Sequence, residues 1–214
     1  MVEETSGHPV DEQTSRHRWL LVNVGAEGSS ASAVDAWRRL RSLGAHYLQP
    51  AVCLLPERPE TTPVAERVVA RVERAGGHAR LFAIGVLDEA GERDVIAAFS
   101  AERAYEYDQV VARTRGFLGE IVMERDSRRA TYTECEESRV DLQRLQRWLS
   151  SIRRRDYFDA PGYAAASAAV ADCEKALAEF EAQAFAVEVH PTEDDLAHAP
   201  WRVRLRALGM PSRR

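Results

Sequence analysis

The sequence predicts an α+β protein, because the spacing of its apolar residues changes character partway along the chain. Between residues 18 and 87, this spacing alternates between the period of two that strands show and the period of 3.6 that helices show. From Asp88 to about residue 187, only the helical spacing recurs. We therefore expect a sheet-containing domain followed by a helical one.

The first half of the chain begins with a strand, a helix and two short strands. The apolar run Trp19–Val24, which Gly25 closes, predicts a buried strand. A helix follows and is expected to end at Gly44. Its expected apolar face consists of Val34, Trp37, Leu40 and Leu43. Residues 46–49 and 51–55 then predict two short strands.

A second helix and a fourth strand complete this half. The helix is predicted over residues 64–75, where Pro63 suits its first turn and Gly76-Gly77 ends it. Residues 78–87 predict the strand. The resulting order, β-α-β-β-α-β, is that of a ferredoxin-like domain.

Three helical stretches are predicted in the second half. Residues 94–125 predict one long helix or two joined ones, residues 136–154 a further helix, and residues 162–187 an alanine-rich helix. The turn signal Pro161-Gly162 separates the last two. We expect them to form an antiparallel helical hairpin or small bundle.

The predicted organisation has four parts. A ferredoxin-like domain over residues 17–90 precedes the helical hairpin or bundle over residues 91–188, and loose tails are expected at 1–16 and 189–214. The N-terminal segment is polar and acidic and lacks the apolar stretch of a secretion signal. No run approaches 18 consecutive apolar residues, so we expect no membrane-spanning segment.

Cysteine usage indicates a cytoplasmic protein. Cys53, Cys135 and Cys173 lie far apart without C-x-x-C spacing, so neither a zinc site nor a disulfide framework is signalled, and a reducing compartment fits best. The net charge of -5 provides no global attraction to nucleic acid.

No catalytic or cofactor motif stands out. The sequence contains no G-x-S-x-G, no H-E-x-x-H, no P-loop and no G-x-G-x-x-G. Cys53 falls in a predicted core strand, where an inert thiol is expected. We therefore expect a protein that is not an enzyme and that uses neither a metal nor an organic cofactor.

Clusters of arginine stand out against the acidic balance. Two fall on predicted helices and consist of Arg38, Arg39 and Arg41, and of Arg153, Arg154 and Arg155. A third, near the C-terminus, consists of Arg202, Arg204, Arg206, Arg213 and Arg214. Because guanidinium groups suit phosphates and other oxyanions, the first two clusters are our candidate DNA- or oxyanion-binding residues. Each cluster also has an explanation that needs no ligand. The first can be a solvated helix face, the second can lie at a helix end because cations are favoured there, and the third can belong to a loose tail.

Several short motifs recur in an order that a known family shares. They include a leading W-L strand at Trp19-Leu20, a W-R-x-L-x-x-x-G-A helix end over residues 37–45, a hairpin over 48–56 and an R-P-E turn over 58–60. Gly76-Gly77, the helix segment 99–107 and the D-Y-F turn at 156–158 follow in the same order. Together they resemble the amino-terminal domain of the chromate-resistance regulator ChrB over residues 18–187.

The first half also resembles the middle domain of phenylacetate-type repressors and the small CRISPR-associated ferredoxin-like nucleases. Those nucleases hold a metal with an aspartate at the end of the first strand, where this chain has Val22-Asn23-Val24. Nuclease activity is therefore not expected. The ChrB resemblance also implies a second domain, assigned to chromate sensing, and we expect this chain to lack it or to find it in another polypeptide.

The resemblance and the arginine clusters lead to two main hypotheses. The first is a dimeric, DNA-binding regulator of chromate or other oxyanion resistance, whose arginines contact phosphates. The alternative is a non-enzymatic sensor or partner-binding module that does not contact DNA. In that case the helical hairpin is the interaction surface, and the arginines bind an oxyanion such as chromate. An enzyme with a cleft between the two halves has the least support.

Overall fold

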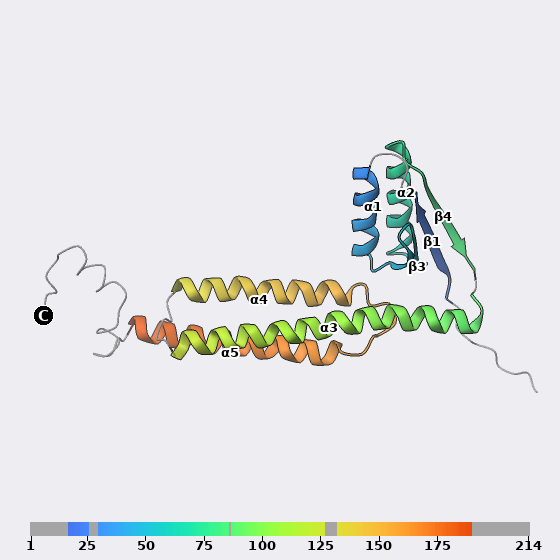
Figure 1. Ribbon diagram of the computed structural model, residues 1–214. Coiled ribbons are helices and arrows are strands. Elements are labelled where there is room, and N and C mark those ends of the chain that lie inside the picture. The colour runs from blue at the N-terminus through green and yellow to red at the C-terminus, as the bar shows by residue number, and fades with distance from the viewer. Residues whose placement is uncertain (1–16, 26–29, 86, 127–131, 190–214) are drawn as a thin grey trace, which may run out of the picture. The chain divides into compact units, whose positions relative to one another are not determined.

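The computed structural model describes residues 17–25, 30–85, 87–126 and 132–189 (Figure 1). The chain divides into two compact units, residues 1–98 and 99–214. Within the described residues, all the strands belong to the first unit, and the second unit is helical. The third helix crosses the boundary between the units. The α+β class predicted from the sequence is confirmed.

The sheet of the first unit has four antiparallel strands in the order β2-β3-β1-β4. The strands are β1 (Trp19–Val24), β2 (His46–Gln49), β3 (Val52–Pro56) and β4 (Ala79–Ile84). Helix α1 (Ser30–Ser42) connects β1 to β2, and helix α2 (Thr62–Arg74) connects β3 to β4. Each βαβ unit thus has a strand of the other unit between its own two strands, which is a split βαβ arrangement.

The core of the first unit lies between the sheet and the two helices, which cover one face of the sheet (Figure 1). The alternation of side chains along β1 directs Leu20 and Val22 to this face, and α2 contributes Val68 and Val72. Burying each large aliphatic side chain is worth about 1.5–3 kcal/mol. This shared core therefore holds both helices in place on the sheet.

Helix α1 buries only half of the apolar stripe that the sequence predicts, because Leu40 and Leu43 lie in or against the core but Val34 and Trp37 do not. Ala36 and Leu40 are buried, whereas Val34 is 45% and Trp37 is 41% exposed. The expected burial of Val34 and Trp37 is therefore wrong. Leu40 belongs both to the expected stripe and to the stripe through Ala36, so periodicity alone cannot separate the two. Ala36 thus lies in the core of this unit, whereas the Trp37 indole is exposed.

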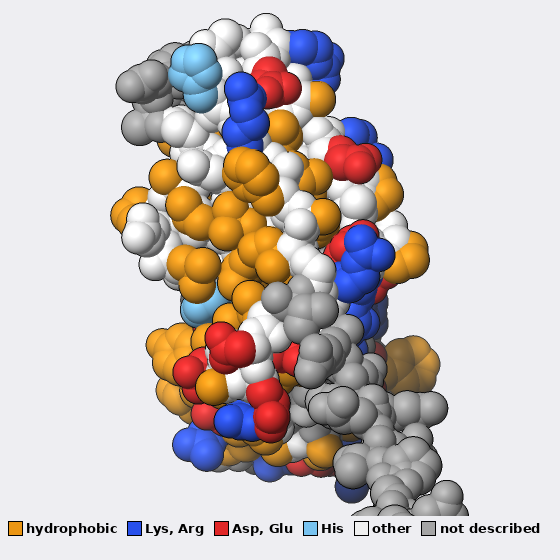
Figure 2. All heavy atoms as spheres, turned by 90° about the vertical axis from the view of Figure 1, so that its right-hand side faces the viewer, with side chains coloured by type: hydrophobic (Ala, Val, Ile, Leu, Met, Phe, Trp, Pro, Cys, Tyr) orange, Lys and Arg blue, Asp and Glu red, His pale blue; other side chains and the backbone are white. Residues whose placement is uncertain are grey.

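The opposite face of the sheet carries apolar side chains that neither α1 nor α2 covers. Leu48 is 49% and Phe82 is 52% exposed, and Phe82 lies opposite Leu21 in the register of β1 and β4. Figure 2 looks onto this side of the sheet, where hydrophobic side chains gather. Exposed apolar patches of this kind are typical of interaction surfaces.

The helical unit is built from α3 (Glu89–Asp126), α4 (Tyr132–Arg153) and α5 (Tyr163–Val189). Helix α3 is one continuous helix, although Gly91 and Gly116 lie within it. Helices α4 and α5 run antiparallel, since Arg139 on α4 pairs with Glu181 on α5 and Gln146 bonds to Glu174. The hairpin that the sequence predicts is therefore present.

The core of this unit recurs at helical spacing on all three helices. It includes Tyr107, Val110 and Phe117 of α3, Leu142, Leu145, Leu149 and Ile152 of α4, and Val170, Cys173, Leu177 and Phe180 of α5. Because each helix buries one face against the other two, the helices depend on one another for stability.

The predicted tails lie outside the described residues, except for Val189 at the end of α5. The C-terminal arginine cluster lies outside them as well. In the described part of the chain, no helix combines the length and the apolar composition that crossing a bilayer requires.

Candidate nucleic-acid interface

The three arginines predicted on the first helix are all exposed on α1. Arg39 is tied to an acidic neighbour, because its Nε donates to Asp35 Oδ2 over 2.8 Å, four residues away. Arg71 of α2 approaches the same oxygen to 3.4 Å. The hydrogen bond from Arg39 and the nearby positive charges hold the pKa of Asp35 below its usual range. Asp35 is therefore a carboxylate at neutral pH and offsets part of the local charge.

Arg38 and Arg41 keep their charge available to a ligand. Arg38 forms no ion pair with another residue that the structure describes. The guanidinium carbon of Arg41 lies 4.9 Å from the centroid of the Trp37 ring, which is a cation–π contact. This helix therefore presents an exposed aromatic ring and arginines side by side.

Helices α1 and α2 together form a basic layer in an acidic chain. They pack side by side on the sheet (Figure 1) and carry six arginines against three carboxylates, a net charge of +3. The whole chain has a net charge of -5. We call this surface the α1–α2 basic layer. Its arginines are Arg38, Arg39, Arg41, Arg67, Arg71 and Arg74. Positive charge gathered on one face attracts polyanions even when the net charge of the protein is negative.

The second predicted cluster lies where α4 ends, and ion pairs occupy most of it. Arg153 Nη1 lies 2.9 Å from Asp159 Oδ1 and 3.3 Å from Asp156 Oδ2. The guanidinium carbon of Arg153 also lies 4.7 Å from the centroid of the Tyr163 ring. The hydrogen bond to Asp159 raises the pKa of Arg153 above its usual value. Arg153 therefore fixes the turn between α4 and α5.

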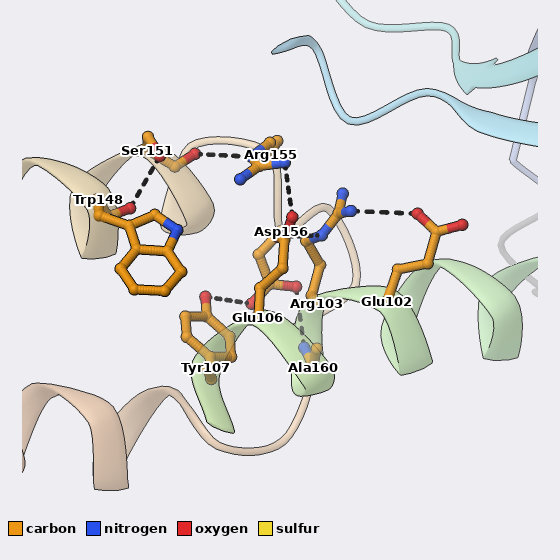
Figure 3. A network of polar contacts seen from close by, with 9 residues as sticks. All are labelled: Glu102, Arg103, Glu106, Tyr107, Trp148, Ser151, Arg155, Asp156 and Ala160. Atoms are coloured by element: carbon orange, nitrogen blue, oxygen red, sulfur yellow. Dashed lines mark hydrogen bonds and ion pairs between the residues drawn. The ribbon is translucent and has the colours of Figure 1, made fainter. Parts of the chain in front are cut away.

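Arg155 belongs to a network of polar contacts within the helical unit (Figure 3). Its Nη1 donates to Glu106 Oε1 over 2.9 Å, and its Nε donates to the Ser151 carbonyl over 3.2 Å. Glu106 also pairs with Arg103, whose Nε lies 2.9 Å from Glu106 Oε2. Arg103 is only 5% exposed, and its Nη2 donates to Glu102 over 3.1 Å. Glu106 thus joins α3 to the end of α4.

Asp156 holds the same turn from the inside. Its side chain is 1% exposed and accepts hydrogen bonds from the Tyr107 hydroxyl and from the Ala160 N–H, each over 2.9 Å. Burial and the bond to Asp156 raise the pKa of Tyr107 to about 12, so the phenol remains a protonated donor. Sequence reasoning missed this pair, because 49 residues separate the partners. Of the contacts in this network, only the ion pair between Arg103 and Glu106 could be expected from the sequence, because the two residues lie three apart on one predicted helix.

Arg154 is the member of the second cluster that stays at the surface. It is exposed and forms no ion pair with any residue in the described ranges. Together with Ser150, Arg153 and Tyr163, it lines an open hollow of about 440 Å³. A small anion would find one uncommitted guanidinium there.

The structure thus places the six candidate arginines in two different units. The arginines on α1 belong to the α1–α2 basic layer, whereas Arg153 and Arg155 mainly bind carboxylates of their own unit. Across the described part of the chain, no three His, Cys, Asp or Glu side chains cluster so that they could hold a metal ion. Cys53, Cys135 and Cys173 are buried free thiols.

The fold and the site define a class of mixed α+β proteins. Their split βαβ domain carries a basic helical layer, and partly buried ion pairs join the helices of their helical unit. Within this class, the family model described as "Protein ChrB, N-terminal" matches residues 33–191, and the chain belongs to that family. The family resemblance drawn from the sequence motifs is therefore confirmed. The chain is a ChrB-like protein associated with chromate resistance. No curated protein and no solved structure matches it.

Proposed function

We propose that the chain is a DNA-binding regulator of chromate or other oxyanion resistance and that the α1–α2 basic layer contacts the DNA backbone. Membership of the ChrB family supports the class of function. The observation that carries the proposal is the concentration of a net charge of +3 on two adjacent helices of a chain whose net charge is -5. Arginine contacts to phosphates supply much of the affinity of proteins for DNA.

The salt dependence of binding tests this mode of contact. Log K falls with log salt concentration at a slope of about -0.9 per neutralised phosphate. Three neutralised phosphates per chain give a slope of about -2.7, so binding weakens about 40-fold between 50 and 200 mM salt. The assay uses the upstream region of the protein's own gene beside a scrambled duplex, with and without chromate. Tighter binding to the upstream region supports regulation, and full affinity at high salt contradicts the proposal.

Charge-matched variants locate the contact surface. The double variant Arg38→Gln/Arg41→Gln removes two uncommitted charges, and we expect the slope to fall to about -0.9. Its control, Arg115→Gln/Arg125→Gln, removes two exposed charges of α3 and should leave the slope unchanged. Equal losses in the two double variants would show that binding follows net charge and not the α1–α2 basic layer.

The dimer expected from the sequence stays a prediction. The open sheet face that carries Leu48 and Phe82 is the surface on which we would test it, because a self-complementary apolar patch suits a two-fold interface. Sedimentation equilibrium of the wild type and of Phe82→Glu gives the answer. We expect the wild type to be a dimer and Phe82→Glu to be a monomer. A wild type that is monomeric at micromolar concentration would contradict the prediction.

A second candidate function is that of a sensor or partner-binding module without DNA contact. The hollow lined by Arg153, Arg154 and Tyr163 favours it, because Arg154 forms no ion pair with any carboxylate that the structure describes. We expect calorimetric titration with chromate to detect binding that Arg154→Gln abolishes and Arg147→Gln does not. Chromate binding without any DNA binding would favour this candidate over the regulator.

A further inference from the structure

A small apolar hollow lies beside the exposed indole of α1. It has a volume of about 180 Å³, and its lining includes Ala33, Trp37, Tyr47, Pro50 and Cys53. These residues come from α1, from β2 and β3, and from the turn between the two strands. The hollow exists because α1 faces the sheet with Ala36 and Leu40 and leaves Trp37 41% exposed.

Among the described residues, the side chains that line this hollow are uncharged. The Tyr47 hydroxyl donates to the Trp37 carbonyl over 3.3 Å, and burial raises the pKa of Tyr47. Burial likewise raises the pKa of Cys53 to about 12, so its thiol stays neutral. Positive charge is found at the rim instead, where the guanidinium carbon of Arg41 lies 4.9 Å from the Trp37 ring centroid.

The size of the hollow restricts what can enter it. Sites for drug-sized ligands measure roughly 300–1,000 Å³, whereas an apolar cavity of roughly 150 Å³ holds benzene. A hollow of about 180 Å³ therefore accommodates a single flat ring system. An aromatic wall favours a ring that stacks, and adjacent arginines favour a ring that carries phosphate. A nucleotide combines these two features.

We propose that this hollow, the Trp37 pocket, receives one unpaired base of a nucleic-acid strand whose phosphates lie on the α1–α2 basic layer. The inference rests on the proposed DNA binding and adds a base contact to it. A paired base is stacked inside the duplex and cannot enter such a pocket, so the strand must be single or the base must be flipped out. Stacking on an aromatic side chain tolerates every base, because each has a π-face.

The test compares two single-stranded oligodeoxynucleotides of equal length and charge, one with all its bases and one with abasic sites at its centre. Fluorescence anisotropy measures their affinity for the full chain. We expect Trp37→Ala to weaken binding of the complete strand by about 5- to 150-fold, which is the usual range for losing one stacked base. The same variant should change binding of the abasic strand less than twofold.

A second variant protects the test against local unfolding. Ala33→Leu adds bulk to the pocket and keeps Trp37 and every arginine, so we expect it also to weaken only the complete strand. Trp37→Phe should retain most of the affinity, because it keeps an aromatic ring. Val34→Ala, which removes an exposed apolar side chain of the same helix, should have no effect. Thermal unfolding checks that all four variants are folded.

Three outcomes would overturn the inference. If Trp37→Ala weakens binding of the complete and the abasic strand equally, Trp37 only positions the arginines and contacts no base. Unchanged binding by Ala33→Leu would show that nothing enters the pocket. Binding of free dAMP as tight as that of the strand would assign the pocket to a free nucleotide. Salt-sensitive duplex binding together with any of these leaves the proposed function standing, whereas no binding of any DNA removes both proposals.

Discussion

The buried hydrogen bond between Tyr107 and Asp156 gives the sharpest test of the helical unit. Tyr107→Phe removes one donor from a carboxylate that is 1% exposed and keeps the donors Ala160 and Arg153. A hydrogen bond to a charged group contributes about 1.5–3 kcal/mol. We therefore expect the variant to lower the free energy of unfolding by about 2 kcal/mol at pH 7.

The pH dependence of this difference follows from the pKa of Tyr107, which rises from 10.0 to about 12 on folding. Folding favours the neutral phenol, so the stabilisation is fully present below pH 10 and is lost as the pH rises through 10 towards 12. At pH 11 the unfolded wild type has largely ionised Tyr107, and the wild type is about 1.4 kcal/mol less stable for this reason. The variant lacks that loss, so the difference should shrink to about 0.6 kcal/mol.

Urea unfolding followed by circular dichroism at 222 nm, at pH 7 and pH 11, measures both differences. Tyr105→Phe is the matched control, because Tyr105 lies on the same helix and is 65% exposed. We expect it to change the free energy of unfolding by less than about 0.5 kcal/mol at pH 7. A difference between the wild type and Tyr107→Phe that stays constant from pH 7 to pH 11 would refute the assignment of a buried neutral phenol.

Three further predictions concern the two units. Glu106→Gln takes the shared carboxylate from Arg103 and Arg155, and we expect urea unfolding to show that it lowers the free energy of unfolding by about 3–5 kcal/mol. Its control Glu102→Gln, at a more exposed pair, should lower it by under about 1 kcal/mol. Similar losses in the two variants would contradict the network. Gly162→Ala meets a φ of +106° and a Tyr107 Cβ at 3.1 Å, so we expect destabilisation by about 1–3 kcal/mol. Gly119→Ala meets nothing within 4 Å inside α3 and should stabilise by about 0.5–1 kcal/mol; a gain at Gly162 would contradict the argument. Burial raises the pKa of Cys53 to about 12 and of Cys173 to about 11, so iodoacetamide at pH 8 should label neither in the folded chain and both in urea, as mass spectrometry will show.

The two arginine clusters show how far local sequence reasoning reaches. The sequence predicts one cluster on an exposed helix face and the other at a helix end, and it does not indicate which arginines find carboxylate partners. In the structure, Arg155 finds Glu106 across 49 residues, while Arg38 forms no ion pair within the described ranges. The partner of a buried charge is chosen by which helices meet, and no local pattern records that choice.

The sequence by itself determined the type and order of the elements and the family to which the chain belongs. The elements could be predicted because the periods of strands and helices are local properties of consecutive residues. The family followed from the order of short motifs along the chain. Only the tertiary structure decided which residues share the buried side of α1 with Leu40, since Ala36 and Trp37 both lie at helical spacing from it. As a result Trp37 lies at the surface beside Arg41, where it can meet a ligand.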